Sequence, residues 1–157
     1  MTLTHLDKNG IPTMVDIAEK AVTRRSATAR SIVSLPAEVL TQLVEGDIQT
    51  KKGSVFQTAI IAGIMAAKKT GELIPLCHPL GLDNCQVNIH FNEQHEVVID
   101  CTASITAKTG VEMEALVGAS IAALTIYDMC KALSHDIVIR ETKLIEKTGG
   151  KRDFKRA

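Results

Sequence analysis

Four segments of this chain have the hydrophobic pattern of β-strands. The first, Ala21–Leu35, is rich in Thr, Ser and Val and shows a rough alternation of polar and apolar residues. Cys85–Phe91 and Val97–Thr106 flank the polar turn Asn92–Glu96, so together they predict a hairpin. The fourth strand is predicted over Asp136–Glu146.

Two helices are predicted between the first strand and the hairpin. The shorter covers Ala37–Glu45, directly after a proline at a favoured first-turn position. The longer covers Val55–Thr70, with Ser54 as the expected N-cap and Gly71 as the expected stop. The residues between these helices predict a loop, 46–52.

A third and longest helix begins at Glu112 and ends near Leu133. Charged residues lie at both of its ends, with Glu114 in the first turn and Asp128 and Lys131 in the last. Its middle is crowded with small residues: Ala115, Gly118, Ala119, Ser120, Ala122 and Ala123. Small side chains let neighbouring backbone come close, so we expect this helix to be central and buried. Charges on a buried helix are costly without partners, which is the first indication of a site.

The predicted order is strand, helix, helix, strand, strand, helix, strand. A hairpin combined with long helices predicts an α+β fold, in which helices pack on one face of an antiparallel sheet. It resembles a ferredoxin-like sandwich with an extra helix and strand. We expect a single domain over residues 1–157, with a flexible N-terminal arm at 1–10 that orders only against a partner and a flexible basic tail at 148–157.

Composition narrows the possible functions. Aromatic residues make up only 3% of the chain. Because proteins that bind single-stranded nucleic acid use aromatic side chains to stack on the bases, this composition argues against that function. The formal net charge is zero, which disfavours a general polyanion binder, although residues 140–157 carry seven basic and three acidic side chains. The longest apolar run, Ala59–Ala67, is too short to predict a membrane span.

The four cysteines, Cys77, Cys85, Cys101 and Cys130, have no CxxC spacing. We interpret them as reduced thiols of a cytoplasmic protein, with disulfides or zinc as the less favoured alternatives. The N-terminus shows no charged-then-apolar targeting signal.

Lysines and carboxylates carry the candidate chemistry. Asp128 and Lys131 are three residues apart and therefore point to the same side of their helix. Lys52 precedes a helix start, where a lysine and a helix N-terminus suit an anion, and a solvated loop lysine is the plainer alternative. His78 lies between two prolines in ELIPLCHPL, and a purely structural role for this histidine is equally compatible with the sequence. Neither a metal-ligand spacing nor a dinucleotide motif is present, so the residues favour acid/base chemistry on a phosphorylated small molecule.

Six motifs resemble the cyclic pyranopterin monophosphate synthase family of molybdenum cofactor biosynthesis, the MoaC family. They cover nearly the whole chain: MVDI (14–17), KKGSVFQTAIIAGIMAAKKT (51–70), LIPLCHPL (73–80), KTGVEMEAL (108–116), LTIYDMCKA (124–132) and KTGGK (147–151). The combination of LCHPL, GVEMEAL and YDMCK is highly specific.

The resemblance implies a substrate and a reaction. The substrate is a 3′,8-cyclised dihydro-GTP made by a partner radical S-adenosylmethionine enzyme, and the products are cyclic pyranopterin monophosphate and pyrophosphate. The imidazole-derived ring opens, a pyrazine ring closes, and a ribose hydroxyl attacks the α-phosphate. None of these steps is a redox step, so we expect no cofactor, and whether Mg²⁺ accompanies the triphosphate stays open.

The resemblance also implies residue roles. Asp128 and Lys131 would be the general acid/base pair, assisted by Lys52 and His78. Lys52 and Arg25 would face the triphosphate. The remaining substrate-binding residues are Leu76, Cys77, His78, Glu112, Met113, Glu114, Lys147 and Lys151.

The resemblance further implies a homo-oligomer, a hexamer built as three dimers, with the site at a dimer interface. Because Lys52 and Asp128 are far apart in sequence, we take them as the pair to test for contributions from opposite subunits. The alternative function is a regulatory oligomer that binds a nucleotide without catalysis. Glu112, Glu114 and Asp128 argue against it, because carboxylates repel a triphosphate.

Overall fold

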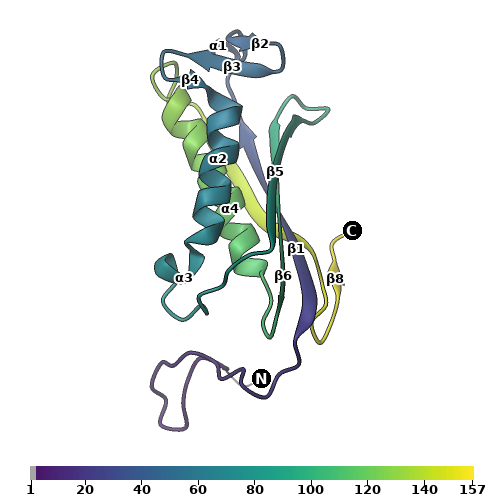
Figure 1. Ribbon diagram of the computed structural model, residues 1–157. Helices are drawn as coiled ribbons and strands as arrows, with labels where there is room; N and C mark the ends of the chain where they lie inside the picture. The colour runs from purple at the N-terminus through teal and green to yellow at the C-terminus, as the bar shows by residue number, and fades with distance from the viewer. Residues whose placement is uncertain (1–2) are drawn as a thin grey trace.

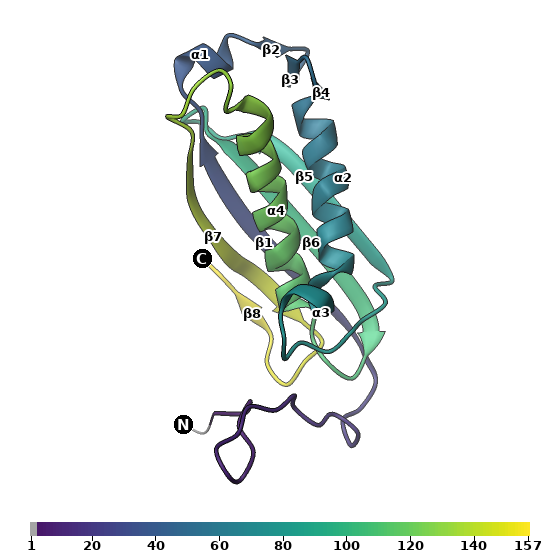
Figure 2. The same cartoon turned by 90° about the vertical axis from the view of Figure 1, so that its left-hand side faces the viewer.

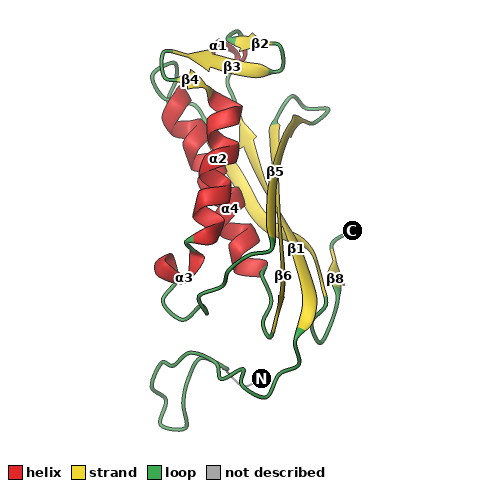
Figure 3. Cartoon of the chain, viewed as in Figure 1, coloured by secondary structure: helices red, strands yellow, loops and turns green. Residues whose placement is uncertain are grey.

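The computed structural model describes residues 3–157. Its helices are α1 (Ala37–Leu40), α2 (Val55–Lys68), α3 (Thr70–Leu73) and α4 (Glu112–Cys130). Its strands are β1 (Thr23–Ser34), β2 (Leu43–Val44), β3 (Asp47–Thr50), β4 (Gly53–Ser54), β5 (Asn84–Phe91), β6 (Val97–Ala107), β7 (Val138–Thr148) and β8 (Phe154–Lys155). Figure 1 shows the long helices on one side of a twisted sheet, and Figure 3 shows the same elements by type.

The main sheet is antiparallel, with strand order β5-β6-β1-β7-β8. Alternate residues of β1, among them Ala27, Ala29 and Val33, are buried beneath the helices. The opposite face of the sheet carries polar pairs between β1 and β6, such as the Arg30–Asp100 ion pair at 2.7 Å. This alternation is typical of an antiparallel sheet that packs on only one face.

The predicted fold class is confirmed. The long strands follow the order β5-β6-β1-β7, which is the arrangement of a ferredoxin-like βαββαβ unit. Figure 2 shows α2 and α4 side by side on one face of this sheet. The added elements are α1, the small sheet β2-β3-β4, α3 and β8.

The prediction that the long helix is central and lets backbone come close is also confirmed. Gly63 of α2 and Gly118 of α4 meet, since a Cβ added to Gly63 would lie 2.9 Å from the Gly118 carbonyl oxygen. A Cβ added to Gly118 would lie 2.5 Å from the Cys101 sulfur on β6. Although α4 is long and apolar enough to cross a membrane, half of it is buried against its neighbours, as in the core helix of a layered domain.

The segment between β1 and α2 differs from its prediction. The expected helix over 37–45 ends at Leu40 and is followed by β2, and Glu45 and Gly46 adopt positive φ in the turn between β2 and β3. The expected loop over 46–52 contains β3. Ser54 does not cap α2 with its side chain; Asp47 does, accepting from the Phe56 amide at 2.8 Å.

Both ends of the chain contain short paired segments. Residues 3–22 form an arm below the domain in Figure 1, closed into a hairpin by a bridge between Leu6 and Pro12. The tail turns back at Gly149, and its strand β8 pairs with Glu146 and Lys147 of β7. The flexibility expected of the arm at 1–10 and of the tail at 148–157 stays a prediction, although both segments carry local pairing. Met1 and Thr2 lie outside the described residues.

All four cysteines are free thiols, as predicted. Cys85 and Cys101 approach within 3.9 Å and share a hydrogen bond rather than a disulfide. Burial raises the pKa of Cys130 to about 11, which makes this thiol unreactive at neutral pH.

Candidate active site

The residues predicted for the site form two groups at opposite ends of α4. Asp128, Lys131 and Lys52 lie at the C-terminal end, near the small sheet in Figure 1. The other predicted residues lie around the N-terminal end. From Glu112 to Asp128 the helix rises about 24 Å, at 1.5 Å per residue. Within one chain, His78 therefore lies far from Asp128 and Lys131.

The C-terminal group is a three-charge cluster. The Lys131 ammonium lies 2.8 Å from Asp128 Oδ1, and the Lys52 ammonium lies 3.4 Å from Asp128 Oδ2. All three side chains are more than half exposed. They border a groove of about 730 Å³ whose other residues come from the small sheet and the end of α4. Lys52 and Asp128 thus belong to the same chain's group, not to opposite subunits.

These charges hold one another in their ionised forms. The hydrogen bond from Lys131, helped by its charge and that of Lys52, keeps the pKa of Asp128 below its ordinary value. The same hydrogen bond raises the pKa of Lys131. A general acid or base works best with a pKa near the working pH. In the isolated chain the pair is therefore charged and not yet tuned for proton transfer.

The start of α2 is not a free anion site, contrary to the prediction for the segment around Lys52. The carboxylate of Asp47 occupies it and accepts hydrogen bonds from the amides of Phe56 at 2.8 Å and Gln57 at 3.3 Å. It also accepts from the Ser54 hydroxyl at 2.9 Å. A helix N-terminus already neutralised by a carboxylate has little left to offer a phosphate.

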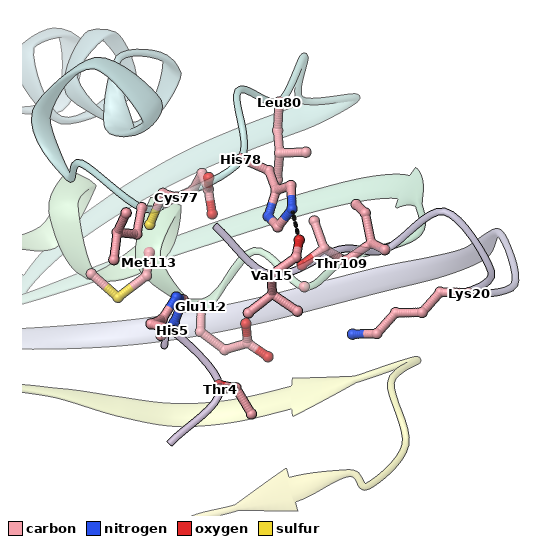
Figure 4. Close-up of a pocket in the computed structure, with 14 residues that line it drawn as sticks. Thr4, His5, Val15, Lys20, Cys77, His78, Leu80, Thr109, Glu112 and Met113 are labelled. Carbon is pink, nitrogen blue, oxygen red and sulfur yellow. Dashed lines mark hydrogen bonds between the residues drawn. The ribbon is translucent and has the colours of Figure 1, made fainter. Parts of the chain in front are cut away.

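The N-terminal end of α4 borders a pocket of about 280 Å³, which we call the ring pocket (Figure 4). Its walls include six predicted residues: Leu76, Cys77, His78, Glu112, Met113 and Glu114. The two prolines of the LIPLCHPL segment, Pro75 and Pro79, restrict its backbone, and Cys77 and His78 between them line the pocket together with the first turn of α4. The Nε2 atom of His78 lies 2.7 Å from the Val15 carbonyl oxygen, so this nitrogen carries the proton and donates it.

Burial changes the chemistry of this pocket. Glu114 is 4% exposed, and its desolvation raises the pKa of its carboxyl group, with a further contribution from the charge of Glu112. Desolvation also raises the pKa of the Cys77 thiol, and the Glu114 charge adds to it. The pocket therefore combines apolar walls with a buried carboxyl group that can accept hydrogen bonds from a ligand.

A second pocket of about 650 Å³, the basic pocket, adjoins the first. Both share Lys20, Thr109, Gly110 and Glu112. The predicted residues Arg25, Lys147 and Lys151 line it, and Lys147 lies 3.2 Å from the Glu112 carboxylate. Gly149 allows the strand end to approach β1, since a Cβ there would lie 2.0 Å from the Arg24 carbonyl oxygen. The Thr-Gly-Gly turn thus brings both tail lysines beside Arg25.

No group of three or more His, Cys, Asp or Glu side chains suited to a metal ion is found among residues 3–157.

The sequence was compared with known proteins. The MoaC family profile matches residues 14–150. A cyclic pyranopterin monophosphate synthase from Xanthomonas axonopodis pv. citri is 57% identical over 97% of this chain and 92% of its own length. The molybdenum cofactor biosynthesis bifunctional protein of Synechocystis is 53% identical, over 96% of this chain and 44% of its own length. Molybdenum cofactor biosynthesis protein 1 of Dictyostelium discoideum is 50% identical, over 94% of this chain and 26% of its own length.

This chain belongs to the MoaC family.

Sequence reasoning missed several pocket residues that the MoaC domain brings together. Thr4, His5, Val15, Ile17 and Lys20 of the N-terminal arm line the ring pocket. Thr4 and His5 precede the segment that the family profile matches. Because the arm has no periodic pattern, nothing in the sequence alone linked it to residues almost a hundred positions away.

Proposed function

We propose that this chain is a cyclic pyranopterin monophosphate synthase. It converts 3′,8-cyclised dihydro-GTP into cyclic pyranopterin monophosphate and pyrophosphate. One observation carries the proposal: every residue that the family resemblance assigned to the site lies in one of two groups, a charge cluster and a pair of adjoining pockets. The names of the relatives, synthase and molybdenum cofactor biosynthesis protein, support the same reaction.

The ring pocket suits the purine-derived part of the substrate. Its apolar walls, among them Leu76 and Met113, accommodate a flat heterocycle. Glu114 supplies a buried carboxyl that accepts hydrogen bonds from ring N–H and amino groups. A guanine-derived ring carries such donors, and pairing with them compensates the cost of burying this carboxyl.

The basic pocket suits the triphosphate. Arg25 presents a guanidinium fixed by its Nε–H, which donates to the Ala107 carbonyl oxygen at 3.2 Å. Lys147 and Lys151 add two ammonium groups from the end of β7 and the turn after it. Cations at the departing β- and γ-phosphates stabilise the charge that develops when pyrophosphate leaves.

Proton transfer falls to Asp128 and Lys131, with Lys52 beside them. In the exposed cluster both groups are held charged, as described above. Burial of the cluster against substrate would lower the pKa of Lys131 and raise that of Asp128, because desolvation disfavours the charged forms. This shift would bring the pair toward the range in which acid/base catalysis is efficient.

The two groups can act on one substrate if they come from two copies of the chain. A second copy related by a two-fold axis, with its α4 antiparallel to the first, brings the C-terminal end of one α4 to the N-terminal end of the other. The outer face of the helix layer suits such packing, because it exposes Ile61, Met65 and Leu124 at half or more of their area. We therefore propose a homodimer as the catalytic unit and three such dimers in the assembly.

The proposal also covers the cofactor requirement, the source of the substrate and the cellular compartment. The chemistry interconverts no oxidation states, so it requires no redox cofactor, and any Mg²⁺ would arrive with the triphosphate. The substrate comes from a radical enzyme that cyclises GTP. The free cysteines suit a reducing, cytoplasmic compartment.

The test is to incubate the protein with the cyclised nucleotide and measure pyrophosphate and pterin. Release of both in equal amounts is expected, and Lys131→Ala serves as the inactive control. Tight binding without pyrophosphate release would favour the regulatory oligomer instead. Among residues 3–157 no observation favours that second function, since a regulator that only binds a triphosphate gains nothing from the exposed Asp128 carboxylate of the charge cluster.

A further inference from the structure

The N-terminal arm forms one wall of the ring pocket. Five of the residues that line the pocket come from it: Thr4, His5, Val15, Ile17 and Lys20. Figure 4 shows Val15 beneath His78, His5 near Met113, and Lys20 at the far side of the pocket. The arm therefore encloses a space that the loop before β5 and the first turn of α4 would otherwise leave open.

Hydrogen bonds fix the arm in this position. Within the arm, the Thr13 amide donates to the His5 carbonyl oxygen at 2.9 Å, and the Asp7 carboxylate accepts from the Ile11 amide at 2.9 Å. These bonds close the hairpin that orients His5.

Two further bonds attach the arm to the other walls of the site. His78 Nε2 donates to the Val15 carbonyl oxygen at 2.7 Å, and the Lys108 ammonium donates to the Ala18 carbonyl oxygen at 2.9 Å. Both donors belong to segments that border the ring pocket. The arm is thus held by the site itself rather than by the hydrophobic core.

Lys20 occupies the junction of the two pockets, which it lines together with Thr109, Gly110 and Glu112. Within residues 3–157 no carboxylate lies within salt-bridge distance of its ammonium group, whereas Lys147 is already paired with Glu112. A substrate with its ring in one pocket and its phosphates in the other must cross this junction at the ribose and the α-phosphate.

We propose that the arm is part of the substrate site, with Lys20 as a ligand of the α-phosphate and His5 as a hydrogen-bonding contact to the ring. The proposal rests on the function proposed above for the same pockets. It gives the arm a role in binding the phosphate that becomes cyclic, separate from the cations that hold the departing pyrophosphate.

The experiment compares Lys20→Ala and His5→Ala with matched controls. Lys8→Ala removes an ammonium from the exposed tip of the same arm, and His90→Ala removes an exposed imidazole from β5; neither residue lines the ring or basic pocket. KM and kcat are measured with the cyclised nucleotide, and Kd is measured with GTP. A lost hydrogen bond to a charged group corresponds to a rise of about tenfold or more, which we expect in KM and Kd for Lys20→Ala.

For His5→Ala we expect a rise of roughly two- to tenfold in KM and in the Kd of GTP, as for a single neutral hydrogen bond. His5→Asn keeps a donor and should recover part of the loss, which a purely structural role for the imidazole would not explain. The two controls should stay within twofold of the wild type. Bound GTP should also slow hydrogen exchange at the Ile11 and Thr13 amides.

Two outcomes overturn the proposal. In the first, Lys20→Ala and His5→Ala match their controls in both KM and Kd. In the second, the wild-type protein binds neither GTP nor the cyclised nucleotide, which removes the proposed function as well. If GTP binds in an arm-dependent manner but the cyclised nucleotide releases no pyrophosphate, only the proposed reaction fails and the role of the arm stands.

Discussion

The carboxyl groups at the two ends of α4 have pKa values shifted in opposite directions. At the C-terminal end Asp128 is exposed and paired with two lysines, which keeps its pKa low. At the N-terminal end Glu114 is buried in a pocket, and desolvation raises its pKa. One helix thus carries one carboxyl group whose ionised form is stabilised by its neighbours and one whose ionised form is disfavoured by burial.

This difference shows that a single chain encloses the ring pocket but leaves the charge cluster open to solvent. The ring pocket has walls on several sides, including the arm, and it already desolvates its carboxyl group. The cluster at the other end remains exposed to water, which screens its charges and weakens their interaction. The charge cluster would be desolvated, as Glu114 in the ring pocket already is, only when substrate and a second copy of the chain bury it.

The largest effect is expected from Asp128→Asn. This change removes a proposed general acid/base, so turnover should fall on the order of 10²–10⁴-fold. Because the side chain is exposed, the melting temperature and the Kd for GTP should change little. Pyrophosphate release, read together with a thermal melt, checks the prediction. Turnover close to that of the wild type would remove Asp128 from the mechanism.

The next largest effect is expected when two inactive variants are mixed and part of the enzymatic activity returns. Asp128→Asn and Lys147→Ala damage opposite ends of α4, so a mixed dimer with antiparallel helices has one intact site and one doubly damaged site. After reversible dissociation and random reassembly, about a quarter of wild-type activity should return.

The matched control mixes Asp128→Asn with Lys52→Ala, whose residues lie 3.4 Å apart in one chain. That pair should recover nothing, because every site formed in the mixture lacks one of the two. Recovery in the control, or none in the test pair despite proven subunit exchange, would contradict the two-copy site.

Gly118→Ala tests the close packing of α4 against Cys101 of β6, which holds the helix on the sheet. The new methyl group would lie 2.5 Å from the Cys101 sulfur, and such overpacking costs about 1–3 kcal/mol. The expected fall in melting temperature is about 2–4 °C per kcal/mol for a domain of this size. Cys101→Ala should relieve the clash in the double variant. Gly81→Ala is the control, because a Cβ there meets nothing within 4 Å.

The smallest effect concerns the pH dependence of stability at Glu114. Its folded-state pKa is raised above the ordinary value of 4.5, so the protonated carboxyl contributes stability below that pH. This contribution is lost as the pH rises through the folded-state pKa. Glu114→Gln, which cannot ionise, should therefore melt higher than the wild type at pH 7 but not at pH 4.

Thermal melts across this range, with Glu93→Gln in the exposed β5–β6 turn as control, measure the effect. A gain for Glu114→Gln that is equal at both pH values would mean that desolvation of the carboxylate is not its cause. The same variant should bind GTP more weakly, because an amide is a poorer acceptor for ring N–H groups than a carboxylate.

Much of the fold could be predicted from the sequence. The alternation in β1, the β5–β6 hairpin and the small residues of α4 are local patterns, and each predicted its element within a few residues. The motifs also identified residues that the structure gathers around α4, since Asp128 and Lys131 share a helix face by their spacing alone.

Local sequence was a poor guide where residues distant in the chain form the hydrogen bonds. Ser54 has the right type and position for an N-cap, but Asp47 on β3 takes the amides of α2 because a carboxylate accepts more strongly than a hydroxyl. The contacts of the arm could not be predicted, because their donors, His78 and Lys108, follow it by more than sixty residues. No window of local sequence contains both partners of such a bond.

The sequence by itself determined which elements form and which residues carry the chemistry, because periodicity and residue type act over a few positions. Only the tertiary structure decided how those residues are grouped. It brought Lys52 to Asp128, and Lys147 to Glu112, and it held these two pairs at opposite ends of one rigid helix. The physical reason is that a helix fixes the distance between its ends, whereas the strands and loops around it decide which distant side chains meet at each end.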